Sequence, residues 1–195
     1  MNASSRRLIL ASTSPFREEL LARLSLDFET ASPHVDETRR GKESATELVR
    51  RLSEAKARAI GTTQPGLIIG SDQVATLGDT ILGKPGSHEY AMEQLRLLSG
   101  NAVIFQTGLC LLDSENESLQ VDVVPFTVYF RELDEKQIDR YLRHDRPYNC
   151  AGSFKSEGLG ITLFERMEGD DPTALIGLPL IRLTTMLEKA GVSLP

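Results

Sequence analysis

Apolar positions divide the chain into buried strands and amphipathic helices. Continuous apolar runs at residues 8–11 and 67–69 predict buried strands. Two longer runs, residues 102–112 and 119–131, are rich in β-forming residues, and the polar stretch 113–117 between them indicates a hairpin. The chain therefore combines an antiparallel pair with strands that alternate with helices. We expect a mixed α/β sheet flanked by helices rather than a regular doubly wound one.

Five segments carry helix start signals, which are an N-cap side chain, a capping box or a proline at the first helical position. The predicted helices cover approximately residues 15–24, 44–60, 87–99, 134–143 and 179–190. Between them, residues 28–42 are polar and we expect them to be irregular. Residues 151–164 are rich in glycine, with strand character towards their end.

Length and composition narrow the class of protein. A chain of 195 residues is long enough to bury a core, and we expect a single domain over residues 1–195, with two lobes as an alternative organisation. The 22 basic and 28 acidic residues give a net charge of -6, which argues against nucleic-acid and membrane partners. A polyphosphate ligand would therefore need cations gathered locally.

Cysteine usage and the N-terminal sequence predict a cytoplasmic protein. Residues 1–20 lack the apolar core of a signal peptide, and no apolar stretch approaches the length of a membrane span. Cys110 and Cys150 are isolated, and neither has metal-ligand spacing. We expect both to be reduced thiols.

Residues 12–17, Ser-Thr-Ser-Pro-Phe-Arg, follow the first predicted strand directly. A strand that leads into a helix N-terminus presents free backbone N–H groups at the positive end of the helix dipole. With Ser14 as the N-cap, the segment also offers hydroxyls, and Arg17 adds a planar cationic group. This combination suits a phosphate. The same hexapeptide also fits an ordinary strand-to-helix junction, and its residues alone leave both interpretations open.

Lys56 occupies a position where the helical pattern expects an apolar side chain. It falls on the same stripe as Val49 and Leu52. A buried, unpaired ammonium is costly, so Lys56 either extends to the rim of the core or faces an anionic partner in a polar cleft. The helix taken alone favours extension to the rim.

Two further charged residues follow the central apolar strand. Asp72 is predicted at the carboxyl end of that strand, where α/β proteins bind ligands, although a turn-capping role fits the position equally well. Lys84, before Pro85, is expected to be an exposed cation one short hairpin away, and taken alone it also fits a plain loop.

Taken in chain order, seven blocks resemble the Maf-like family of nucleoside triphosphate pyrophosphatases. The blocks are Leu8-Ile9-Leu10-Ala11-Ser12 with Ser14-Pro15 and Arg17, Val35-Asp36-Glu37, Ala55-Lys56-Ala57, Gly70-Ser71-Asp72, Gly83-Lys84-Pro85, Ala151-Gly152 and Ile176-Gly177-Leu178-Pro179. The resemblance extends over about residues 8–190. It implies an inosine-triphosphatase-like fold with two lobes around a central cleft, a divalent cation such as Mg²⁺ or Mn²⁺, and hydrolysis of a nucleoside triphosphate to the monophosphate and diphosphate. It also suggests a homodimer.

The resemblance assigns a role to each of the residues singled out above. Four of them would bind the triphosphate, namely Ser12, Arg17, Lys56 and Lys84. Asp72 would accept the proton in the reaction, and Glu37, alone or with Asp72, would bind the metal. On this interpretation Lys56 need not extend to the rim, because a phosphate would be its partner.

Three positions indicate which base is bound. Phe16, Gln73 and Glu157 resemble the 7-methyl-GTP branch of the family more than the thymidine and uridine triphosphate branch, although the usual Trp at position 16 is replaced by Phe. Methylation of guanine at N7 leaves a delocalised positive charge, which an aromatic face and a carboxylate favour over a neutral base. Glu157 could also accept hydrogen bonds from the N1–H and N2 edge of guanine.

Two alternatives stay open on the sequence. The first is the same pyrophosphatase chemistry with another nucleotide, such as thymidine or uridine triphosphate or a differently modified base. The second is a regulator of cell division that binds nucleotides without turnover. Asp72 together with Lys56 and Lys84 favours catalysis, because a sensor needs the cations but not the base.

Overall fold

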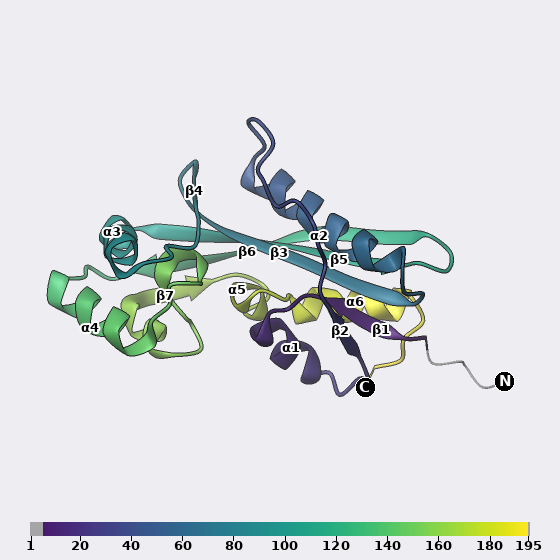
Figure 1. Ribbon diagram of the computed structural model, residues 1–195. Coiled ribbons are helices and arrows are strands. Elements are labelled where there is room, and N and C mark those ends of the chain that lie inside the picture. Colours follow the sequence, from purple (N-terminus) through teal and green to yellow (C-terminus); the bar gives the residue numbers. More distant parts are fainter. Residues whose placement is uncertain (1–5, 195) are drawn as a thin grey trace.

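A single seven-stranded mixed sheet forms the centre of the computed structural model, which describes residues 6–194 (Figure 1). In chain order the strands are β1 (Leu8–Ala11), β2 (Glu29–Ala31), β3 (Leu67–Leu77), β4 (Thr80–Leu82), β5 (Ala102–Asp113), β6 (Ser118–Phe130) and β7 (Phe164–Glu168). Their spatial order is β2-β1-β3-β5-β6-β7, and β4 forms a hairpin with β3. β1 is parallel to both of its neighbours, and the other pairings are antiparallel. The predicted mixed sheet and the β5–β6 hairpin are confirmed.

Helices form at the five predicted segments. The helices are α1 (Pro15–Ala22), α2 (Ala45–Gly61), α3 (His88–Leu98), α4 (Glu135–Asp145), α5 (Thr173–Ile176) and α6 (Leu180–Lys189). The capping boxes of α2, at Ser44, and of α4, at Asp134, are both formed. The sequence did not predict α5, which at four residues is too short to show a helical pattern.

One loop prediction is wrong and another needs refinement. The polar segment 28–42 contains β2, which forms because it pairs with the buried β1. The glycine-rich segment 151–164, with strand character expected only towards its end, forms two 3₁₀ turns, at Ala151–Ser153 and Leu159–Leu163, and β7 begins at its last residue, Phe164. Gly152 has φ = 76°, a left-handed conformation that interrupts extended backbone and favours glycine.

Helices cover both faces of the sheet around β1, β3 and the adjoining half of β5. Side chains alternate along β1: Leu8 and Leu10 pack in the core with α1 and α6, whereas Ile9 faces α2. On the α2 side, Gly70 and Gly108 leave room for the helix backbone. A Cβ atom on Gly70 would lie 2.1 Å from the carbonyl oxygen of Ser53, so α2 packs directly on the strands.

The other halves of β3 and β5, with β6 and β7, form a second lobe together with α3 and α4 (Figure 1). Its core contains a cluster of edge-to-face aromatic rings. The rings belong to Phe105, Phe130, Phe154 and Phe164. The long strands β3 and β5 therefore contribute to both lobes, and the expected two-lobed architecture is confirmed.

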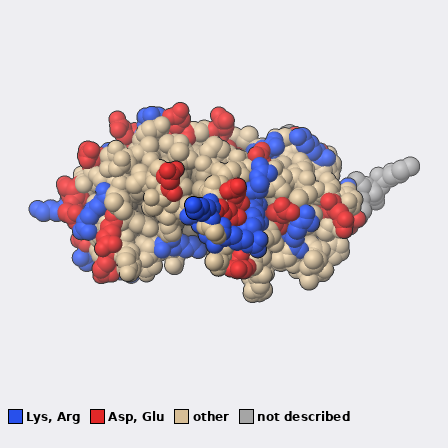
Figure 2. Space-filling model, turned by 90° about the horizontal axis from the view of Figure 1, so that it is seen from above, with Lys and Arg blue, Asp and Glu red and all other residues tan. Residues whose placement is uncertain are grey.

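No helix within residues 6–194 is long and apolar enough to cross a membrane. The prediction about a leader concerns residues 1–20, of which residues 1–5 lie outside the described part. Cys110 and Cys150 are free thiols, as predicted. On the face shown in Figure 2, basic side chains lie next to acidic ones rather than in a separate basic patch.

Candidate active site

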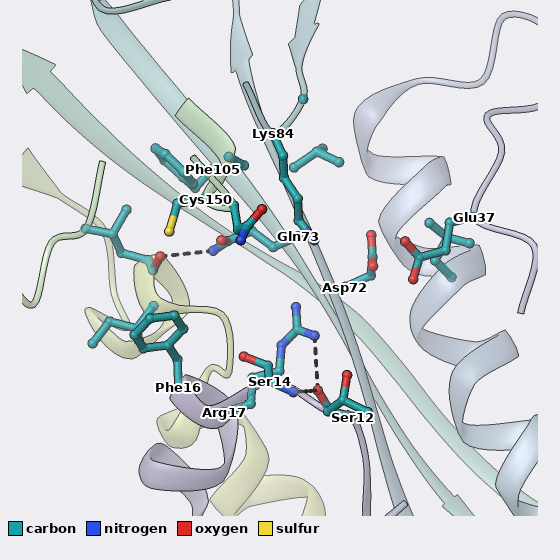
Figure 3. Close-up of a pocket in the computed structure, with 18 of the residues that line it drawn as sticks. Ser12, Ser14, Phe16, Arg17, Glu37, Asp72, Gln73, Lys84, Phe105 and Cys150 are labelled. Atoms are coloured by element: carbon teal, nitrogen blue, oxygen red, sulfur yellow. Dashed lines mark hydrogen bonds between the residues drawn. The ribbon is translucent and has the colours of Figure 1, made fainter. Parts of the chain in front are cut away.

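A large cavity opens where one edge of β3 lacks a neighbour. β1 pairs with β3 as far as Gly70, and β4 pairs with the same edge only from Ala75. Residues 71–74 therefore have no strand partner on that edge within the described chain. The cavity at this gap has a volume of about 970 Å³, and residues from both lobes line it (Figure 3).

The cavity brings together all the residues that the sequence singled out for function. Those that line it are Ser12, Phe16, Arg17, Glu37, Lys56, Asp72, Gln73, Lys84 and Glu157. They come from α1, α2, β3, the segments that follow β1, β2 and β4, and the loop between the two 3₁₀ turns. The structure thus joins segments that are distant in sequence, while the chemical role of each residue stays a prediction.

Asp72 lies within β3 and not at its carboxyl end, which corrects the prediction. The strand continues to Leu77 because its pairing with β5 does not stop, and Asp72 lies opposite Gly108. Its carboxylate is buried on the α2 side, with only 7% of the residue exposed. It nevertheless reaches the cavity, because β1 ends opposite Gly70, two residues before Asp72, and leaves this edge of β3 uncovered.

The turn between β1 and α1 has the geometry of an anion cradle. Ser12 is buried, and its Oγ accepts hydrogen bonds from the backbone N–H of Ser14 at 3.1 Å and from Nη1 of Arg17 at 3.5 Å. Ser14 occupies the N-cap position as predicted, but its side chain makes no cap bond. Pro15 has no N–H, so in the first turn of α1 the N–H groups of Phe16 and Arg17 are left for another acceptor at the cavity.

Arg17 is held in place by two hydrogen-bond partners. Besides its contact with Ser12, its Nε donates to the carbonyl oxygen of Gly177 at 2.8 Å. The hydroxyl of Ser71, which is fully buried in β3, donates to the same carbonyl at 2.8 Å. Burial lowers the pKa of Arg17, and the charges of Asp72 and Glu37 oppose this shift. The guanidinium is thus fixed at the end of the cavity next to α1.

Lys56 is buried and paired with two carboxylates. Its Nζ lies 2.6 Å from Oδ1 of Asp72 and 2.7 Å from Oε1 of Glu37. The preference for extension to the rim is wrong, and the alternative of an anionic partner in a polar cleft is confirmed. Asp72 is close enough because Gly70 and Gly108 let α2 approach the sheet. Hydrogen bonding with Lys56 lowers the pKa of Glu37.

The remaining charged and aromatic residues lie around the mouth of the cavity. Lys84 follows β4 and is exposed, and its charge also lowers the pKa of Glu37. Phe16 is partly exposed on α1, and Glu157 is exposed on the loop between the 3₁₀ turns. Gln73 has a structural role that the sequence did not predict. Its Nε2 donates to the carbonyl oxygen of Ala174 in α5 at 2.6 Å.

Sequence reasoning missed the residues that support the α5–α6 segment. Asp171 is 2% exposed; its Oδ1 accepts from the N–H of Thr173 at 3.0 Å and its Oδ2 from that of Ile181 at 2.8 Å. One carboxylate therefore joins the first turns of α5 and α6 and fixes the turn that carries the Gly177 carbonyl. The Asp-Pro-Thr sequence at this point is a helix-start signal that could have identified it.

Glu37 and Asp72 are suited to bind a divalent cation. Both contact one ammonium group, so their oxygens lie around one cation position, and carboxylate oxygens are ligands that Mg²⁺ prefers. The part of the chain that the structure describes contains no cluster of three or more His, Cys, Asp or Glu side chains with metal-site geometry. Two protein carboxylates fit Mg²⁺, which usually takes its other ligands from phosphates and water.

The chain is a mixed α/β protein whose cavity gathers cationic and acidic side chains. A family model described as Maf-like protein matches residues 7–190, and the chain belongs to this family. Two relatives are each named 7-methyl-GTP pyrophosphatase. That of Nitrosococcus oceani is 57% identical over 94% of this chain and 93% of its own length. That of Pseudomonas aeruginosa is 59% identical over 96% of this chain and 98% of its own.

Solved structures support the fold. A HAM1 protein from Coxiella burnetii superposes with a TM-score of 0.54, covering 94% of this chain and 99% of the other. At 15% sequence identity this likeness shows the fold alone. It confirms the expected inosine-triphosphatase-like architecture.

Proposed function

We propose that this protein hydrolyses 7-methyl-GTP to 7-methyl-GMP and diphosphate and so removes a modified nucleotide from the pool. The observation that carries the proposal is that one cavity contains the cations, the carboxylates and the residues predicted to select the base. The names of relatives that are 57–59% identical over nearly the whole chain support the same substrate.

The triphosphate binds among groups that converge from three segments. Arg17 approaches from α1, Lys56 from α2 and Lys84 from the end of β4. The N–H groups of the first α1 turn add fixed dipoles to these charges. The groups are positioned before the reaction begins, so they stabilise the charge that develops on the departing diphosphate without reorganisation.

Asp72 accepts the proton of the attacking water. Lys56 holds its Oδ1, and in residues 6–194 the structure shows no hydrogen-bond donor for Oδ2, which leaves that oxygen for a water molecule. A divalent cation held by Glu37 and Asp72 would polarise the phosphate and help to neutralise the leaving group. In the free protein, the contact with Lys56 fixes the orientation of this carboxylate, as the positioning of a general base requires.

The base contacts Phe16 and Glu157, which both line the cavity. The ring of Phe16 provides an apolar face for stacking, and the carboxylate of Glu157 faces a purine edge that carries N–H donors. Because 7-methylguanine is cationic, both contacts favour it over neutral bases. The two free thiols are consistent with a reducing cytoplasmic location for this activity. A homodimer stays a prediction.

Replacement of Asp72 tests the chemistry. We expect Asp72→Asn to retain nucleotide binding and to lower diphosphate release from 7-methyl-GTP by ~10²-fold or more, because the amide cannot accept the proton. Glu165→Gln, an exposed substitution outside the cavity, is the matched control. Turnover by Asp72→Asn equal to that of the control would exclude Asp72 as the base.

Replacement of Glu157 tests the substrate. The wild type should show a higher kcat/KM for 7-methyl-GTP than for GTP, and for GTP than for thymidine triphosphate. Glu157→Gln should reduce the preference for the methylated base by about 1–3 kcal/mol, since a neutral amide replaces a charged acceptor. An equal loss for all three nucleotides would mean that Glu157 supports the loop, and a wild type that prefers thymidine triphosphate would refute the proposed substrate.

A further inference from the structure

The ammonium group of Lys56 lies between the two carboxylates that suit a divalent cation. It contacts Asp72 at 2.6 Å and Glu37 at 2.7 Å, and 7% of the residue is exposed. Figure 3 shows the side chains of Asp72, on β3, and Glu37, in the segment between β2 and α2, next to each other. The structure therefore pairs a monovalent cation with the oxygen atoms that the proposed function gives to a metal.

The charge balance of the cavity opposes a second cation in the free protein. Five cationic side chains line the cavity, against the three carboxylates of Glu37, Asp72 and Glu157; the cations are Arg17, Lys56, Lys84, Arg146 and Lys155. A divalent ion that took the position of the ammonium group between the two carboxylates would have to displace Lys56 from both. The displaced ammonium would then be buried without a partner, which is unfavourable.

A triphosphate reverses this balance. It brings at least three negative charges and several oxygen atoms that accept hydrogen bonds from an ammonium group. The side chain of lysine has a flexible four-carbon stem and a compact charge, so Lys56 can change partners by rotations of its own side chain. Transfer of its Nζ to a phosphate oxygen releases both carboxylates at the moment when further cationic charge becomes favourable.

We infer that Lys56 is an exchangeable counter-ion that makes metal binding depend on the nucleotide. In the free protein it neutralises Asp72 and Glu37 and excludes the divalent ion. When a triphosphate is bound, it moves to the phosphate, and the carboxylates become metal ligands. This inference rests on the proposed function, because it assumes the metal site and the triphosphate site described there.

Metal binding to the free protein tests the inference without catalysis. Mn²⁺ is titrated into the full-length chain, and the unbound ion is measured by electron paramagnetic resonance. We expect Lys56→Met to bind Mn²⁺ at least tenfold more tightly than the wild type in the absence of nucleotide. Lys84→Met is the matched control, since it removes one cavity cation that does not contact the carboxylates, and its affinity should rise less. Equal affinities of wild type and Lys56→Met overturn the inference.

Further variants locate the bound ion and guard against misfolding. The added affinity should disappear in Lys56→Met/Asp72→Asn, and an unchanged affinity would overturn the inference by placing the ion elsewhere. Lys56→Gln serves as a second neutral variant if circular dichroism shows that Lys56→Met does not fold. It should show the same gain over the wild type, and no gain overturns the inference.

Two outcomes separate this inference from the proposed function. A wild type that releases diphosphate from 7-methyl-GTP with Mg²⁺, but binds Mn²⁺ as tightly as Lys56→Met without nucleotide, refutes the counter-ion role alone. If the wild type together with α,β-methylene-GTP binds no more Mn²⁺ than the analogue binds by itself, the metal site is refuted, and the inference with it. The expected result is enhanced Mn²⁺ binding by the wild type in the ternary complex.

Discussion

Addition of a single methyl group at Gly70 should move α2 away from the sheet and impair the site. A Cβ atom at this position would lie 2.1 Å from the carbonyl oxygen of Ser53 and 2.9 Å from the backbone N of Ala57. Both contacts are with the helix backbone, so no side-chain rotation relieves them. To restore an ordinary carbon–oxygen contact, the helix must shift by about 1 Å.

The size of the effect follows from this displacement. Overpacking of this kind costs about 1–3 kcal/mol, and at about 3 °C per kcal/mol for a chain of this length the Tm should fall by roughly 3–9 °C. Lys56 lies on the displaced turn of α2, next to Ala57. Because a 1 Å misplacement of site residues can reduce catalysis by ~10²-fold, we expect Gly70→Ala to lower kcat/KM by ~10–100-fold.

Thermal unfolding and diphosphate release, measured on the same preparations, test this reasoning. Gly61→Ala, on the same helix as Lys56, is the control. Its Cβ would lie 2.8 Å from Cδ2 of Leu112, but this atom is the end of a flexible side chain and can move away. Its Tm and kcat/KM should remain close to those of the wild type. If Gly70→Ala matches this control in both measurements, close packing of α2 on the sheet does not determine the position of Lys56.

Two further predictions concern the support of the site and its thiols. Asp171→Asn replaces an oxygen that accepts from the N–H of Ile181, so urea unfolding should show a loss of about 1–3 kcal/mol; an unchanged stability would contradict the role of this carboxylate. Burial raises the pKa of Cys110 to about 12, so Cys110 should resist iodoacetamide in the native protein. Cys150 lines the cavity, and bound nucleotide should slow its alkylation; alkylation of Cys150 at an unchanged rate would place the nucleotide elsewhere.

Local patterns predicted much of the secondary structure. Helix starts and apolar runs are determined by neighbouring residues, which is why the capping boxes at Ser44 and Asp134 and the β5–β6 hairpin were identified correctly. β2 escaped detection because it is only three residues long and depends on a partner distant in sequence. Short elements of this kind are specified by tertiary contacts rather than by their own pattern.

The residues singled out from the sequence all line the cavity, but their contacts could not be predicted. Lys56 was recognised as anomalous, yet its partners depend on how closely α2 approaches β3. The position of Asp72 within a continuous strand depends on pairing with β5, which the local sequence does not reveal. The hydrogen bond between Ser71 and Gly177 joins residues 106 positions apart, and no spacing rule predicts it.

The continuity of the long strands limits how the protein can respond to a ligand. The β3–β5 register runs without interruption from Leu67 opposite Asp113 to Thr76 opposite Ile104, and it passes beneath the cavity. Two domains joined by a linker can close by bending at the linker, but here a hinge between the lobes would break main-chain hydrogen bonds in the middle of a sheet. The part of the sheet that forms the floor of the cavity is therefore expected to keep its shape when a ligand binds. Adjustment to a nucleotide is left to the walls, which are side chains and short loops, so selection depends on a shape that exists before the ligand arrives.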